Sequence, residues 1–183
     1  MPREHGTGTS TWVEALHNYG ELELAAGNPE LAVELLERAL AGAREFPGTG
    51  HENLILHGLG DAALEVGDPV RAAARYRAAL VAARANGVRR SVPFCLAGLA
   101  AAEARSGDRA HAALLWGAAQ RADSRYGPML PNERHRYEEA TADLDEQLVE
   151  TGRNLEEDDA LDLALTEPGS PGNAPRPRAS SGS

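Results

Sequence analysis

Small and large apolar residues recur along the chain with a period of 40 residues. Glycine or alanine returns to the same relative position in three consecutive segments, and large apolar residues follow in register. The small-residue columns are Gly20/Gly60/Ala100, Gly27/Gly67/Gly107, Ala32/Ala72/Ala112 and Ala39/Ala79/Ala119, and the large-residue columns are Leu16/Leu56/Leu96 and Leu36/Tyr76/Trp116. Two helices approach closely only where one of them carries a small side chain, so the columns predict repeated helix-on-helix packing.

Each segment reads as two helices joined by a tight turn. Gly27 or Gly67 ends the first helix, because glycine enters the left-handed region without a steric penalty. Asn28 or Asp68 then caps the second helix through its side-chain oxygen, and a proline follows at the first helical position. The pattern predicts a first helix over 11–26 and second helices over 29–46, 69–86 and 108–125. Connections this short make the paired helices antiparallel.

The C-terminal part predicts helices that cap the repeats. A helix runs from Pro131 to about Gly152, with Tyr137, Leu144 and Leu148 on one stripe. Asn154 caps a short last helix that ends at Leu165. A solenoid needs such terminal helices with a polar outer face. The predicted organisation is a disordered arm over 1–10, three repeats over 11–126, capping helices over 127–166 and a disordered tail over 167–183.

Small residues spaced by twelve and then by seven resemble the tetratricopeptide repeat, with 40 residues per copy. Gly60, Ala72 and Ala79 show this spacing in the second copy. The resemblance covers roughly residues 11–125. It implies an all-α, tetratricopeptide-like solenoid of three helical hairpins plus C-terminal capping helices. It also implies a concave groove that binds a protein or a peptide.

A second resemblance covers residues 95–165 in more detail. It rests on Leu96-Ala-Gly-Leu-Ala100, Leu115-Trp-Gly-Ala-Ala119, Leu130-Pro131, Glu133-Arg134 and Tyr137-Glu138. These segments resemble the C-terminal repeat region of actinobacterial AfsR-like and LuxR-type ATPase transcriptional regulators. The resemblance implies a sensor or scaffold role in a bacterial transcriptional or signalling regulator. The chain has no G-x-x-x-x-G-K segment and no evident helix-turn-helix reading head, so ATP hydrolysis and direct DNA binding are not carried over.

The first helix of each repeat is expected to line the concave groove. Residues spaced by three or four lie on one face of a helix, which predicts the groove residues. They are Glu14, His17, Glu21, Leu54, His57, Asp61, Glu65, Phe94 and Arg105. An acidic groove with two histidines and an apolar floor suits a basic or amphipathic peptide. The alternative is an ordinary solvated face.

The sequence also contains candidate metal-binding, catalytic and phosphate-binding residues, each with a simpler structural interpretation. Glu14-x-x-His17 matches one half of a di-iron site, but a second Glu-x-x-His pair is missing, and we expect no metal and no cofactor. Cys95 is expected in the core with no catalytic role, and the chain is expected not to be an enzyme.

A set of five arginines either binds phosphate or nucleic acid or forms an outer face whose charge is balanced by Glu34 and Glu37. It comprises Arg71, Arg75, Arg84, Arg89 and Arg90.

Composition narrows the class of protein further. The net charge of −10 disfavours nucleic acid as a direct partner. Neither an apolar run of transmembrane length nor a signal peptide is seen, so no membrane association and a cytoplasmic location are expected. The prediction is a protein–protein interaction module. The alternative is a truncated, free-standing remnant or a structural repeat that self-associates through Trp12 and Val13 of the first helix.

Overall fold

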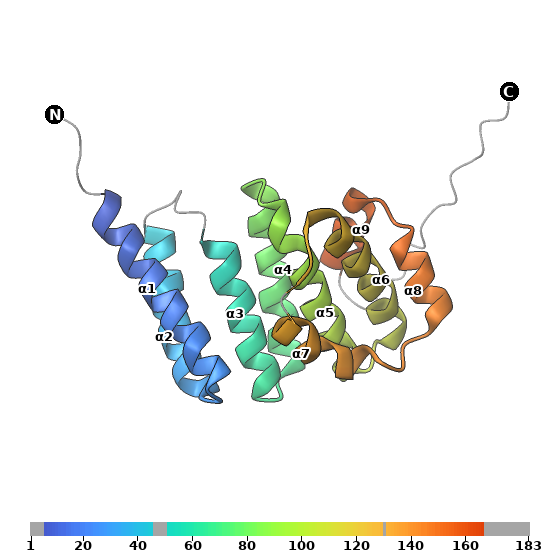
Figure 1. Cartoon of the computed structure of the whole chain (residues 1–183), viewed down its shortest axis with the longest axis horizontal. Coiled ribbons are helices and arrows are strands. Elements are labelled where there is room, and N and C mark those ends of the chain that lie inside the picture. The colour runs from blue at the N-terminus through green and yellow to red at the C-terminus, as the bar shows by residue number, and fades with distance from the viewer. Residues whose placement is uncertain (1–5, 46–50, 130, 167–183) are drawn as a thin grey trace, which may run out of the picture.

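The computed structural model describes residues 6–45, 51–129 and 131–166, and this part of the chain contains α-helices, one 3-10 turn and their connections. Its first six helices form three antiparallel pairs that stand in a row (Figure 1). The helices are α1 (Gly6–Ala25), α2 (Pro29–Glu45), α3 (Glu52–Glu65), α4 (Pro69–Ala85), α5 (Val92–Ser106), α6 (Arg109–Tyr126), α7 (Pro131–Thr141), α8 (Glu146–Arg153) and α9 (Glu157–Leu165), with the 3-10 turn η1 (Arg89–Ser91). The predicted all-α solenoid of helical hairpins is confirmed.

The turns inside the pairs have the predicted geometry. Gly67 has a φ of +78°, and the Asp68 N–H donates to the carbonyl of Ala63 at 2.8 Å, which closes α3. The Asp68 carboxylate then accepts from the N–H of Arg71 at 3.0 Å and caps α4. Gly27 and Gly107 also have positive φ angles, so all three turns share one conformation.

Residues of the small-residue columns and residues of the large-residue columns contact each other in the folded chain. A methyl group added to Gly20 would lie 2.7 Å from Leu36, and one added to Gly60 would lie 2.6 Å from Tyr76. Tyr76 also lies against Gly98 of the next repeat. Leu36, at Gly20 and Gly58, and Tyr76, at Gly60 and Gly98, therefore each fill the gap between two neighbouring first helices. This contact explains why the columns recur at one period.

The single helix predicted from Pro131 to about Gly152 is in fact two helices. The chain turns after Thr141, and the Asp145 carboxylate caps α8 by accepting from the N–H groups of Gln147 and Leu148. Leu144 lies in the connection and does not share a helical stripe with Tyr137. Asn154 ends α8 and does not cap α9, where Glu156 holds the cap position.

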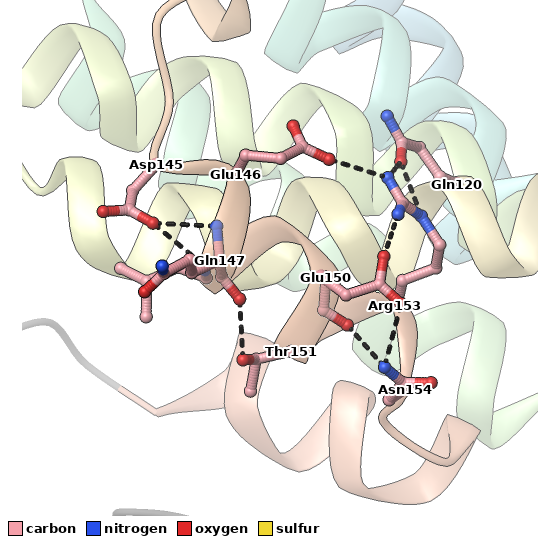
Figure 2. Close-up of polar contacts among 9 residues, drawn as sticks. Gln120, Asp145, Glu146, Gln147, Glu150, Thr151, Arg153 and Asn154 are labelled. Carbon is pink, nitrogen blue, oxygen red and sulfur yellow. Dashed lines mark hydrogen bonds and ion pairs between the residues drawn. The ribbon is translucent and has the colours of Figure 1, made fainter.

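Glycines bring α8 unusually close to α6. A methyl group added to Gly117 would meet the carbonyl of Val149, and one added to Gly152 would meet the carbonyl of Leu114. Beside this crossing, Arg153 donates to the Gln120 amide oxygen at 2.7 Å and pairs with Glu146 (Figure 2). The helix α8 thus caps the last repeat through backbone contact rather than through a large apolar face.

A buried ionic cluster holds α9 across α4 and α6. Glu103 is 2% exposed and accepts from Arg77 and from the His111 ring. Arg77 also donates to the carbonyl of Ala164 at 3.1 Å, and Nε2 of His111 lies 3.2 Å from the carbonyl of Leu163. Burial lowers the pKa of His111, but the hydrogen bond and charge of Glu103 outweigh it and raise the pKa overall.

The helix α1 begins at Gly6, so residues 6–10 of the predicted disordered arm are helical. The remainder of that arm and the predicted tail over 167–183 lie outside the described residues. None of the helices in the described part has the length and apolar character needed to cross a membrane.

Candidate functional site: the concave face and the helix that covers it

The concave face begins on α1 with three of the predicted groove residues. Glu14 is exposed, and Nε2 of His17 lies 3.9 Å from Oε1 of Glu21. The Glu21 carboxylate lies over Gly58 of α3, where any larger residue would collide with it. Burial and the neighbouring charges of His51 and His57 lower the pKa of His17, and Glu14 partly opposes this.

The same face continues on α3, where Asn53, His57, Asp61 and Glu65 follow one another at intervals of four residues. The helix α7 lies over this part of the groove, in front of α5 in Figure 1. The groove is therefore not open along its full length. Its second half is occupied by a helix of the same chain.

Asp61 is the centre of the covered half. It is 1% exposed, and its Oδ1 accepts from the hydroxyls of Tyr76 and Tyr137, each at 2.6 Å. Its Oδ2 accepts from the guanidinium of Arg136 on α7. Three donors thus surround one buried carboxylate, which is the arrangement that makes a buried charge tolerable.

His57 completes the cluster. Nε2 of His57 lies 2.9 Å from the Tyr137 hydroxyl oxygen. Because this hydroxyl donates its own proton to Asp61, its oxygen accepts a hydrogen bond from the Nε2–H of His57. Burial and the charge of Asp61 raise the pKa of both Tyr76 and Tyr137, which keeps their hydroxyls protonated as donors. Burial lowers the pKa of Arg136, but Asp61, the two tyrosines and Glu65 together outweigh it and raise that pKa overall.

Two of the other predicted groove residues, Phe94 and Glu65, contact the cluster. The Phe94 ring packs edge-on against His57 with 4.9 Å between centroids, and Glu65 pairs with Nε of Arg136 at 3.4 Å. Leu54 is half-buried on α3. Arg105 donates to the carbonyl of Leu64 at 3.1 Å, so it closes the end of α3.

Sequence reasoning missed four members of this site. Tyr76 filled a core column, and its hydroxyl had no predicted partner. Arg136 and Tyr137 were assigned to a capping helix, although an arginine beside a tyrosine in a polar helix is a visible signal. Asn53 was also missed: it is buried, and neither polar atom of its amide has a hydrogen-bond partner in the described part of the chain.

Of the remaining candidate residues, Cys95 lies in the core, and three of the five arginines form ion pairs within the chain. Cys95 is buried as predicted, and burial with the charge of Asp61 raises the pKa of its thiol. In the predicted basic set, Arg75 pairs with Glu37, as in the alternative of a balanced outer face, while Arg84 and Arg89 pair with Asp162 and Glu157 of α9. Within the described residues, no group of three or more His, Cys, Asp or Glu side chains is placed to hold a metal ion.

Comparisons with known proteins agree with this geometry. Residues 13–85 match the family model of the tetratricopeptide repeat, which covers the first two helical pairs. No curated protein and no solved structure matches the chain. Tetratricopeptide repeats generally mediate protein–protein interaction, and the chain is similar to them in sequence over these residues and in fold beyond them.

Proposed function

We propose that the chain is a protein- or peptide-binding scaffold whose binding surface is the α1 side of the concave groove. The observation that carries this proposal is the exposed carboxylate of Glu14 beside the partly exposed side chain of Glu21. Glu14 is exposed, and the Glu21 side chain is 39% exposed beside His17. A basic or amphipathic segment complements this surface by charge. The function needs no cofactor and no bond chemistry.

We place this scaffold in the cytoplasm, in a bacterial transcriptional or signalling regulator of the AfsR-like or LuxR type. The support is the resemblance around Leu115-Trp-Gly-Ala-Ala119 and Tyr137-Glu138. In this proposal the chain senses a partner, while another polypeptide or another part of the regulator supplies nucleotide hydrolysis and DNA contact.

Site-specific photocrosslinking tests the binding surface. A photoreactive phenylalanine replaces Glu14 in one chain and Val81, which is exposed on α4, in a matched control. Both chains are illuminated in native bacterial lysate, and the adducts are identified by mass spectrometry. The proposal expects an adduct from position 14 that is absent at position 81. Equal adducts at both positions, or none at position 14, contradict it.

Self-association is a second candidate, and the exposed apolar side chains of α1 favour it. Trp12 is 46% exposed and Leu22 is 67% exposed, whereas Val13 is buried against Gly42 and cannot take the interface role predicted for it. Sedimentation velocity across a concentration series tests the idea. A dimer that disappears in Leu22→Glu supports it, and a monomer at all concentrations rules it out.

A further inference from the structure

We propose that α7 is a built-in ligand of the concave groove, and that the surface beneath it binds a partner helix presenting an arginine followed by a tyrosine. This proposal deepens the proposed function, because it assigns a second binding surface and a partner chemistry to the same groove. It rests on the contacts that hold α7 in the groove.

The contacts of α7 are those of a bound ligand. From residue 134 onward, the buried side chains of this helix are Tyr137 and Thr141, and the Thr141 hydroxyl bonds to its own helix. Within the groove, α7 is held through Tyr137 and Arg136, which reach Asp61, His57 and Glu65. Outside the groove, Arg134 of α7 pairs with Asp123 of α6, and Ala140 packs against the core. By contrast, α8 and α9 bury glycine, alanine, valine and leucine in their interfaces.

The groove beneath α7 is built independently of α7. Asp61 receives the Tyr76 hydroxyl from α4, and the Phe94 ring from α5 orients His57. These residues belong to the repeats, whose packing is set by the recurring small and large columns. With α7 displaced, the groove presents one carboxylate with an unfilled acceptor site, one imidazole and one aromatic ring.

The chemistry of an external occupant follows from what Asp61 requires. A buried carboxylate must keep a cation, so an entering segment has to replace Arg136. Tyr76 remains as a donor to Asp61, whereas the Nε2 proton of buried His57 loses its acceptor unless the segment also brings a hydroxyl in place of Tyr137. Glu65 on the rim adds a second negative charge that favours a basic segment. A helix with adjacent arginine and tyrosine exchanges with α7 without leaving a buried group unpaired.

The test uses the chain's own helix as the probe. A fluorescein-labelled peptide of residues 131–142 is titrated with the full-length chain, and binding is followed by fluorescence anisotropy. The double variant Arg136→Ala/Tyr137→Ala loosens the resident helix, and we expect it to bind the peptide at least about tenfold more tightly than the wild-type chain. Adding Asp61→Asn to the double variant should abolish this gain.

Two controls make the outcome specific. A peptide with Ala and Phe in place of Arg136 and Tyr137 should not bind the double variant. The chain variant Glu139→Ala changes an exposed residue of α7 and should behave as wild type. Absence of peptide binding by a double variant with unchanged helical circular dichroism overturns the proposal. A dimer that exchanges α7 between two copies also overturns it, in favour of a second copy as the occupant.

Hydrogen exchange on the wild-type chain keeps the proposal testable if the double variant fails to fold. A ligand-like α7 must open alone, so its amides should exchange at least about tenfold faster than those of α5. Equal protection of the two helices overturns the proposal. Neither experiment involves position 14, so failure here leaves the crosslinking test of the proposed function unaffected, and the reverse also holds.

Discussion

The groove contains the same histidine–carboxylate pair twice, once in the first repeat and once in the second. His17 and Glu21 on α1 correspond to His57 and Asp61 on α3, and in both pairs the closest nitrogen and oxygen lie 3.9 Å apart. The first pair keeps access to solvent, whereas Asp61 is almost completely buried. The chief difference is that α7 covers the second pair, so one repeated motif has two environments.

This comparison shows that a groove position does not define a binding site by itself. Equivalent side chains on α1 and α3 differ in their surroundings because, within the described residues, α7 covers those on α3. The remaining experiments measure how far the two halves differ.

The two halves of the groove should differ most in the stability that is lost when their carboxylates are removed. Asp61→Ala leaves Arg136 without its main buried partner and should lower the free energy of unfolding by about 3–5 kcal/mol. Glu21→Ala in the open half should lower it by less than about 1 kcal/mol, as expected for a partly solvated pair. Urea unfolding followed by circular dichroism measures both, and equal losses would contradict the division of the groove.

Removal of one hydroxyl should have a smaller effect. Tyr137→Phe keeps the ring but removes the group between His57 and Asp61, and it should destabilise the chain by about 1–3 kcal/mol. Tyr19→Phe on the exposed side of α1 is the matched control and should leave the midpoint unchanged. A Tyr137→Phe chain as stable as wild type would mean that the ring alone holds α7.

The pH dependence of stability reports on His17, which lies in the half of the groove that α7 does not cover. The pKa of His17 in the folded chain lies below its ordinary value of 6.5, so the unfolded chain binds more protons as the pH falls through 6.5. Stability should therefore decrease on acidification, and His17→Gln should remove this decrease.

His111 provides a control of opposite sign for this measurement. Its pKa is raised above 6.5 in the folded chain, so its contribution to stability is complete below 6.5 and is lost as the pH rises through the folded pKa. In His111→Gln the loss on the alkaline side should disappear. A loss of stability on the acid side that persists in His17→Gln would assign that effect to another group.

The smallest effect concerns Glu14. Its charge raises the pKa of His17 against the stronger effects of burial and the two neighbouring histidines. Glu14→Gln should lower the midpoint of the His17 titration in NMR spectra without changing the unfolding midpoint. An unchanged titration would place Glu14 too far from His17 to define one acidic surface with it.

The sequence predicted the repeats well because their information is local and repeated. Gly60 and Tyr76 have counterparts at Gly20 and Leu36, so each packing contact is visible as a column. The turn at Gly67-Asp68-Pro69 is likewise determined by three adjacent residues. The nine predicted groove residues lie on first helices, but the sequence did not indicate which of them would be covered.

The position of α7 could not be predicted in the same way. Its polar sequence occurs once, and its binding depends on Asp61, which is 75 residues away from Arg136. The break between α7 and α8 was more accessible, since Asp145 precedes Glu146 and Gln147 as a helix cap should. It was hidden by an apparent stripe through Tyr137, Leu144 and Leu148.

The cluster around Glu103 has a consequence for cooperativity. In a simple solenoid each repeat contacts only its neighbours, so unfolding can proceed from one end. Here α9 returns from the end of the chain and binds Arg77 of the second repeat as well as His111 of the third. These contacts close a loop in the network of contacts, so the second and third repeats should unfold together. The first pair, α1 and α2, packs on the second only as a neighbour, for example through Leu36 at Gly58, and should be able to unfold before it.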